Sequence, residues 1–142
     1  MPVNTEGGKS LKRTRPKILL ARFDLDGHDK GILFIINALR NAGMEIVYIH
    51  FSNPKEIVNA AIEEDADLIG ITSSLGQHLL VSSLLMEELH NNKADIPVII
   101  GGVIPGTDVP ELINMGIKKV FGPGSTPQEA VTFVSQITQQ GK

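Results

Sequence analysis

The stretch that decides the fold reads Lys17-Ile18-Leu19-Leu20-Ala21-Arg22-Phe23-Asp24-Leu25-Asp26-Gly27-His28-Asp29-Lys30-Gly31. Its first five residues are mostly apolar and predict a buried strand, and the apolar-periodic segment that begins at Ile32 predicts a helix. Residues 22–31 are therefore expected to form a strand-to-helix loop. In open α/β sheets such loops lie at the carboxyl ends of the strands, where ligands bind.

The loop carries an imidazole, His28, two residues after the carboxylate of Asp26, with glycines at 27 and 31 that allow the backbone to turn. A metal-ligating imidazole must be neutral at its coordinating nitrogen. A carboxylate that accepts a hydrogen bond from the other ring nitrogen fixes that tautomer and makes the ligand more basic. The alternative is a solvated acidic loop in which the aspartates only form turns. These residues by themselves leave both interpretations open.

Beyond this loop the chain alternates between helical and strand patterns. The predicted order is helix 32–41, strand 45–50, helix from 53, strand 67–72, helix 78–91, strand 96–100, helix 108–115, strand 117–121 and helix 127–139. Such alternation implies a parallel sheet with right-handed crossovers and helices on both faces. We expect a flavodoxin-like, doubly wound α/β sheet of five strands in the order 2-1-3-4-5, with its switch point between strands one and three.

Small residues follow three of the predicted strands: Ser73, the pair Gly101-Gly102, and the run Gly122-Pro123-Gly124-Ser125. Each alone is typical of a helix start or a turn. Together they would leave open space beside the sheet, with backbone N–H groups available to a phosphate. The sequence thus predicts room for an elongated ligand at this edge.

Composition narrows the class of protein. The chain has 142 residues, 42% of them hydrophobic, which suits one domain with a real core. A net charge of -3 and 4% aromatic residues argue against a nucleic-acid partner, and the lack of cysteine excludes disulfides and thiolate metal sites. No apolar segment approaches the roughly 20 residues of a membrane span, so we expect a cytoplasmic protein. Residues 1–16 predict a disordered N-terminal arm and residues 17–142 the domain itself.

The linked motifs Asp26-x-His28-x-x-Gly31, then 41 residues, then Ser73-x-Leu75, and later Gly101-Gly102 resemble a known family. It is the cobalamin (B12)-binding domain of adenosylcobalamin-dependent mutases and methionine synthase, and the resemblance covers about residues 16–139. The runs 25–31 and 121–125 are most similar to small subunits or C-terminal domains of acyl-CoA mutases, the methylmalonyl-CoA and 2-hydroxyisobutyryl-CoA mutase group.

The resemblance implies roles for individual residues. His28 would bind the cobalt from below in place of the cofactor's dimethylbenzimidazole, and Asp26 would hold the imidazole. The displaced nucleotide tail would enter a groove between the strand ends. The implied cofactor-binding residues are Arg22, Asp26, Gly27, His28, Asp29, Gly31, Ser73, Leu75, Gly101, Gly102, Gly122 and Ser125.

The chain departs from that pattern before the motif. Arg22 stands where the mutases usually carry a lysine, and Phe23-Asp24 stands where they usually carry Pro-Gly. Arginine keeps the positive charge and can bridge Asp26 with two hydrogen bonds, but its planar fork is not equivalent to an ammonium group. Asp24 adds a carboxylate to the loop.

The resemblance implies the cobalamin-binding small subunit of a heterooligomeric acyl-CoA mutase, an isomerase that uses adenosylcobalamin in radical chemistry. The isolated chain would be inactive and would supply no catalytic residue beyond cofactor ligation. A large subunit, the TIM barrel of such mutases, would hold the acyl-CoA substrate.

Three alternatives remain from the sequence. Gly27 and Asp29-Lys30 favour the acyl-CoA group over the small subunit of glutamate mutase. A corrinoid carrier of a methyltransferase usually has a helical bundle before the domain, and here only some 16 residues precede the first strand. A response-regulator receiver domain needs a phosphorylatable aspartate after strand three, where this chain has Ser73.

Overall fold

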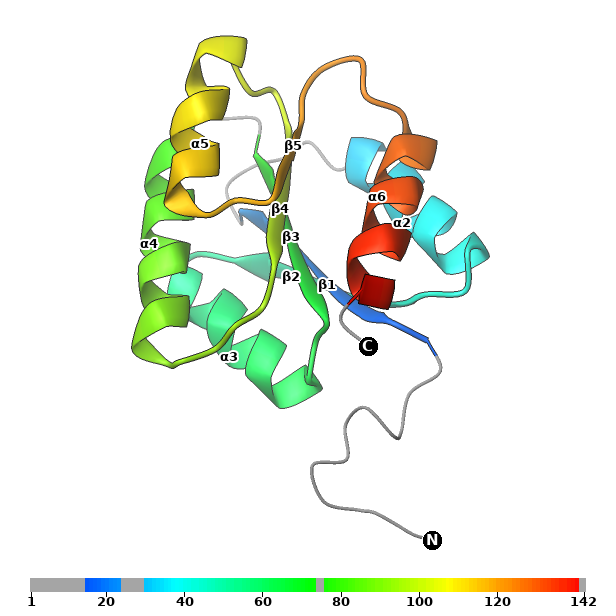
Figure 1. Ribbon diagram of the computed structural model, residues 1–142, viewed down its shortest axis with the longest axis horizontal. Coiled ribbons are helices and arrows are strands. Elements are labelled where there is room, and N and C mark those ends of the chain that lie inside the picture. The colour runs from blue at the N-terminus through cyan, green and yellow to red at the C-terminus, as the bar shows by residue number, and fades with distance from the viewer. Residues whose placement is uncertain (1–14, 24–29, 74–75, 141–142) are drawn as a thin grey trace, which may run out of the picture.

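The computed structural model describes residues 15–23, 30–73 and 76–140, and these form a parallel sheet between two layers of helices (Figure 1). The strand order is β2-β1-β3-β4-β5, so the expected fold and topology are confirmed. Most of the expected N-terminal arm lies outside the described residues, and the division into arm and domain stays a prediction. The elements are β1 Lys17–Phe23, α2 Lys30–Asn41, β2 Glu45–Phe51, α3 Pro54–Glu64, β3 Leu68–Ser73, α4 His78–Asn91, β4 Val98–Gly102, the 3-10 turn η1 Gly106–Asp108, α5 Val109–Met115, β5 Lys119–Phe121 and α6 Pro127–Gln140.

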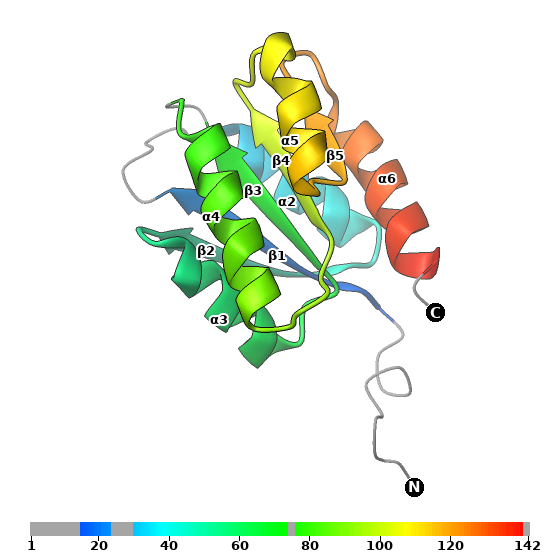
Figure 2. The ribbon, with the colours of Figure 1, turned by 60° about the vertical axis from the view of Figure 1, so that its left-hand side comes forward.

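The helices cover the two faces of the sheet unequally. Helices α3, α4 and α5 lie on one face, while α2 and α6 lie on the other (Figure 1). Figure 2 shows α3 and α4 in front of the sheet and α2 behind it. Strands covered on both sides can bury every residue, which explains why Ile18, Leu19, Leu20 and Ala21 are all buried.

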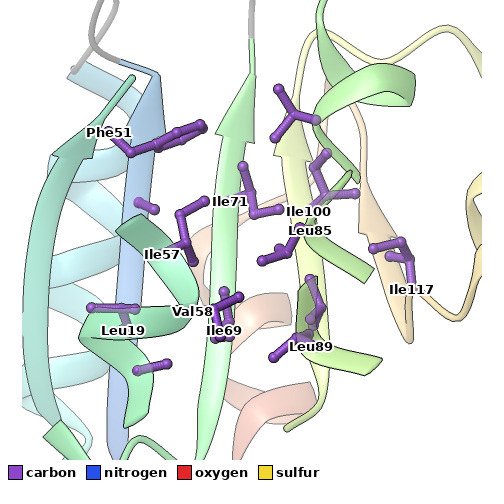
Figure 3. Close-up of a cluster of buried hydrophobic side chains, with 14 of the residues drawn as sticks. Leu19, Phe51, Ile57, Val58, Ile69, Ile71, Leu85, Leu89, Ile100 and Ile117 are labelled. Atoms are coloured by element: carbon purple, nitrogen blue, oxygen red, sulfur yellow. The ribbon is translucent and has the colours of Figure 1, made fainter. Parts of the chain in front are cut away.

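Each face has its own core because side chains alternate along a strand. Leu19 of β1 and Ile69 of β3 point toward α3 and α4, whereas Ile18 of β1 points toward α2 and α6. The larger cluster includes Phe51, which is 1% exposed (Figure 3). Complete burial of such a side chain stabilises the fold by about 2–3 kcal/mol before entropy costs. The two cores together fix the register of the strands.

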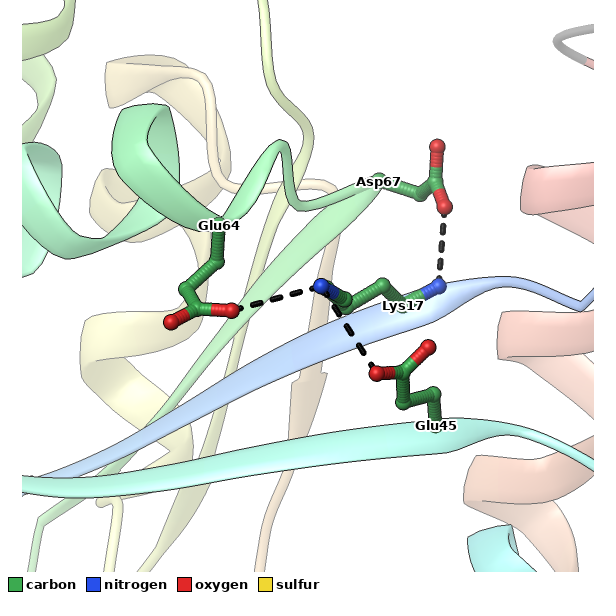
Figure 4. Close-up of polar contacts among 4 residues, drawn as sticks. All are labelled: Lys17, Glu45, Glu64 and Asp67. Atoms are coloured by element: carbon green, nitrogen blue, oxygen red, sulfur yellow. Dashed lines mark hydrogen bonds and ion pairs between the residues drawn. The ribbon is translucent and has the colours of Figure 1, made fainter. Parts of the chain in front are cut away.

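Polar contacts tie the amino ends of the strands to each other. The Nζ of Lys17 lies 3.3 Å from Oε1 of Glu64 and 3.6 Å from Oε2 of Glu45, while its backbone N donates to Oδ2 of Asp67 at 2.8 Å (Figure 4). Lys17 thereby links β1 to the start of β2, the end of α3 and the residue before β3. This edge is opposite the one predicted to bind a ligand.

Strand β1 is two residues longer than the sequence predicts. Arg22 and Phe23 belong to the strand rather than to the loop, since they pair in register with His50 and Phe51 of β2. The rings of Phe23 and Phe51 pack with centroids 5.6 Å apart. The loop therefore begins after Phe23, and α2 begins at Lys30.

Three strands begin later than expected, β3 by one residue, at Leu68. Strand β4 starts at Val98, after Pro97, which has no N–H group to donate to a neighbouring strand. Strand β5 starts at Lys119 because the N–H groups of Gly116 and Ile117 first close helix α5, bonding to the carbonyls of Ile113 and Leu112. The expected strand residue Ile117 is still buried, at 2% exposure.

The large apolar side chains of α3 are not all buried. Ile57, Val58 and Ala61 are fully buried, but Ile62 is 48% exposed. Ile62 follows Ala61, the last buried residue of α3, and lies outside the buried face of the helix. Among the residues that the structure describes, no helix is long and apolar enough to cross a membrane.

Candidate functional site

The carboxyl edge of the sheet brings the ends of all five strands into one row. In register across it lie His50 of β2, Arg22 of β1, Thr72 of β3, Gly101 of β4 and Phe121 of β5. The chain reverses its direction of winding between β1 and β3, which is the switch point of the sheet. Ligand sites in this class of fold form beside such a point.

A groove of about 450 Å³ lies beside this edge, on the face covered by α2 and α6. Its floor includes Gly70 of β3, and its sides include Ile35 of α2, with Ala130 and Val134 of α6. This volume falls within the range of about 300–1,000 Å³ that is typical of small-molecule sites. The walls are largely apolar and suit a flat ring or an elongated chain.

Two glycines that line the groove allow neighbouring atoms to pack closely against the backbone. A Cβ atom at Gly70 would lie 2.6 Å from Cδ2 of Leu20, so the floor has no room for a side chain without movement of Leu20. At Gly102 the backbone has φ of +124°, and a Cβ would lie 2.1 Å from the carbonyl oxygen of Ser73. Glycine at 102 thus lets β3 and β4 come close together at the groove wall.

The structure brings several of the predicted site residues together. Five of them line the groove: Gly31, Gly101, Gly102, Gly122 and Ser125. Ser73 is buried at 5% exposure and does not line the groove; its carbonyl accepts a hydrogen bond from the N–H of Val103 at 3.0 Å. The predicted residues Asp26, Gly27, His28, Asp29 and Leu75 lie outside the described residues.

Arg22 is a buried cation, at 6% exposure, near the end of β1. Its Nε donates to the hydroxyl of Tyr48 and its Nη2 donates to Nε2 of His50, each at 3.0 Å. Because a guanidinium can only donate, Nε2 of His50 is the acceptor and the ring carries its proton on Nδ1. These two bonds fix the Nε–Nη2 side of the guanidinium toward β2.

Sequence reasoning did not identify Tyr48 and His50 as partners of Arg22. The parallel register of the two strands, which the sequence alone does not give, places His50 opposite Arg22 and Tyr48 two residues earlier on the same face. The rings of Tyr48 and His50 also contact edge to face, with centroids 5.3 Å apart. The apolar side walls from α2 and α6 were likewise not predicted as parts of the site.

The chain matches the B12 binding domain family over residues 16–132. A groove of this size beside the switch point of a doubly wound sheet is typical of α/β domains that bind small molecules. The chain belongs to the B12 binding domain family.

Curated relatives include free-standing small subunits. The chain is 34% identical over 131 residues to the pivalyl-CoA mutase small subunit of Xanthobacter autotrophicus, covering 91% of this chain and 88% of the relative. It is 35% identical over 130 residues to the 2-hydroxyisobutanoyl-CoA mutase small subunit of Aquincola tertiaricarbonis, covering 89% and 95%. It is also 36% identical to the methylmalonyl-CoA mutase large subunit of Propionibacterium freudenreichii subsp. shermanii, of which it covers 17%.

Solved structures with the same fold include proteins of two kinds. A cobalamin-binding protein from Desulfitobacterium hafniense has a TM-score of 0.75 at 23% identity, covering 87% of this chain and 60% of that chain. The receiver domain of a Francisella response regulator has a TM-score of 0.70 at 22% identity, covering 90% and 100%. These structural similarities show the fold alone. The family match places this chain with the B12 binding domains rather than with the receiver domains.

Proposed function

We propose that this chain is the cobalamin-binding small subunit of an adenosylcobalamin-dependent acyl-CoA mutase. The observation that carries the proposal is the groove at the carboxyl edge, which glycines at 31, 70, 101, 102 and 122 line beside the switch point. Family membership and the similarity to two mutase small subunits support the same assignment. When bound, the cofactor supplies a cobalt–carbon bond whose homolysis starts a carbon-skeleton rearrangement.

The residues of this chain would have three tasks. His28 would ligate the cobalt through a neutral ring nitrogen, and Asp26 would accept a hydrogen bond from the other nitrogen, which fixes the tautomer. The groove would hold the nucleotide tail between α2, α6 and the strand ends. The apolar side walls, formed by residues such as Ile35 and Val134, would exclude water from the tail's ring system.

The positions of Phe23 and Lys30 in the chain support a role for His28 beside the groove. They flank residues 24–29, and they end β1 and begin α2 at the carboxyl edge. Gly31, in the first turn of α2, lines the groove directly. A ligand held by the residues between Phe23 and Lys30 would therefore have its tail next to the groove.

Gly31 provides a sharp test because a Cβ there would meet no atom within 4 Å. Gly31→Leu should fill part of the groove without strain, and it should stabilise α2 because leucine favours a helix more than glycine does. We expect this variant to bind hydroxocobalamin at least about tenfold more weakly, a loss of about 1.4 kcal/mol. Titration followed by the change in the corrin absorption spectrum measures the affinity.

Two controls make the result decisive. Gly31→Ala adds a single methyl group and should bind with nearly the parent affinity. Gly106→Leu adds the same bulk at an exposed glycine of η1, where a Cβ also meets no atom within 4 Å, outside the groove. Equal affinity of Gly31→Leu and the parent would mean that no tail occupies the groove.

The second part of the proposal concerns the partner. A large subunit, a TIM barrel that holds the acyl-CoA, would cover the carboxyl edge and shield the reaction from water. The chain alone should show no turnover. Mixed with adenosylcobalamin and a candidate large subunit from the same genome, it should isomerise branched acyl-CoA esters, and cofactor should strengthen association. Turnover by the chain alone would contradict this arrangement.

A further inference from the structure

A partly buried histidine–aspartate contact lies on the opposite face of the sheet from the groove. His78 is the first residue of α4, and its side chain is 6% exposed. Its Nε2 lies 2.7 Å from Oδ2 of Asp108, the last residue of η1. Because a carboxylate can only accept, Nε2 of His78 is the donor, and a hydrogen bond to an ionised group is among the stronger kinds.

This contact joins two segments that leave neighbouring strands. Four residues, 74–77, separate Ser73 at the end of β3 from His78, and four residues, 104–107, separate Val103 after β4 from Asp108. At their starts the two segments are joined by the hydrogen bond from the Val103 N–H to the Ser73 carbonyl. At their ends they are joined by His78 and Asp108.

The second of these segments continues the groove wall. Gly102 and Val103 line the groove, and Ile104, next in the chain, is 4% exposed and packs into the core beside α4. The segment therefore crosses from the groove at one end to Asp108 at the other. A displacement of Asp108 would be transmitted along these few residues to Val103, whose own side chain is 61% exposed at the groove.

Burial of His78 costs free energy that an apolar side chain at the same position would not cost. Its Nδ1 and the hydroxyl of Ser82, one turn further along α4, are buried and have no hydrogen-bond partner among the described residues. A buried polar group without a partner costs free energy that an apolar side chain would avoid. Most of the other buried residues of α4 are apolar, including Val81, Leu85 and Leu89.

We propose that His78 and Asp108 are positioning residues that hold the Gly102–Val103 wall of the groove in the place needed by the nucleotide tail. This inference rests on the proposed cobalamin-binding function. Neither side chain lines the groove, so the pair acts through the backbone between Asp108 and Val103. Binding of the corrin ring, which the loop after β1 would hold, should not depend on the contact between His78 and Asp108.

The test compares two ligands on the full chain: hydroxocobalamin, and diaquocobinamide, which lacks the nucleotide tail. His78→Leu, of similar volume but without the donor, should weaken cobalamin binding about tenfold, the equivalent of one charge-assisted hydrogen bond. Its cobinamide affinity should not change. His78→Gln should bind cobalamin more tightly than His78→Leu and close to the parent affinity, because the amide Nε2 can donate to Asp108. Ser82→Ala, which removes the other unpartnered group, is the matched control.

Amide hydrogen exchange at Val103 gives a second result that needs no corrinoid. In the unliganded chain, His78→Leu should increase exchange at Val103, while Ser82→Ala should not. Unchanged exchange together with unchanged cobalamin affinity would overturn the inference. Equal losses for cobalamin and cobinamide, in step with lower stability toward urea, would show a merely structural role. A parent chain that binds no cobalamin would contradict the proposed function instead, and exchange at Val103 would still test the pair.

Discussion

Replacement of Gly102 by alanine should destabilise the fold sharply. The new Cβ would lie 2.1 Å from the carbonyl oxygen, 2.9 Å from the carbonyl carbon and 3.0 Å from the nitrogen of Ser73. All three are backbone atoms of β3, so no side-chain rotation relieves the overlap. The φ of +124° at Gly102 adds backbone strain, because residues with a side chain rarely adopt this conformation.

The cost can be worked from these two effects. Backbone strain at such a φ costs about 2 kcal/mol. Separation of β4 from β3 would also weaken the Val103–Ser73 hydrogen bond, worth about 1 kcal/mol. For a chain of 142 residues the entropy of unfolding is about 0.3 kcal/mol per degree, so a loss of about 3 kcal/mol lowers Tm by about 10 °C.

Differential scanning calorimetry of Gly102→Ala and Gly106→Ala measures this difference. Gly106 is exposed and unhindered, so its alanine variant should melt within about 2 °C of the parent. A Gly102→Ala variant as stable as the parent would refute the account of the groove wall. The strain also means that a bulky residue at 102 would not cleanly test tail binding, whereas one at 31 would.

Two further predictions concern the scaffold. Asn53→Ala removes the side chain that accepts the N–H of Lys55 at 2.8 Å in the capping box of α3, and urea denaturation should show a loss of about 1 kcal/mol. An unchanged midpoint would contradict the cap. Lys17→Met should cost less than about 1 kcal/mol, with the difference from the parent shrinking at high salt, because its ion pairs with Glu45 and Glu64 are partly exposed. A difference that grows with salt would contradict this reasoning.

The order of elements could be predicted from sequence because the two periodicities are well separated along the chain. Helix α4 has the predicted bounds, 78–91, since a turn signal precedes it and apolar residues fill it. Strand ends were predicted less well. Whether Phe23 continues β1 depends on Phe51, 28 residues away, and whether Ile117 joins β5 depends on how Gly116 closes α5.

The candidate site shows the same division. Glycine pairs at strand ends are visible in the sequence, and Gly101, Gly102 and Gly122 do line the groove. The burial of an individual side chain is not visible in the sequence: Ser73, expected in the groove, is buried and does not line it. The contacts of Arg22 with β2 and of His78 with Asp108 required the register of the strands and the packing of α4 against α5, which arise only in three dimensions.

The central claim is that His28 is the lower ligand of cobalt, and electron paramagnetic resonance of the Co(II) form tests it most directly. The chain is produced with ¹⁵N-labelled histidine, loaded with unlabelled cobalamin and reduced. Because ¹⁵N has spin one half, a histidine ligand would change the superhyperfine splitting from the triplets of ¹⁴N to doublets, and His28→Ala would abolish the doublets. Triplets that persist in the labelled protein would show that the cofactor's own base remains bound, and would contradict the account.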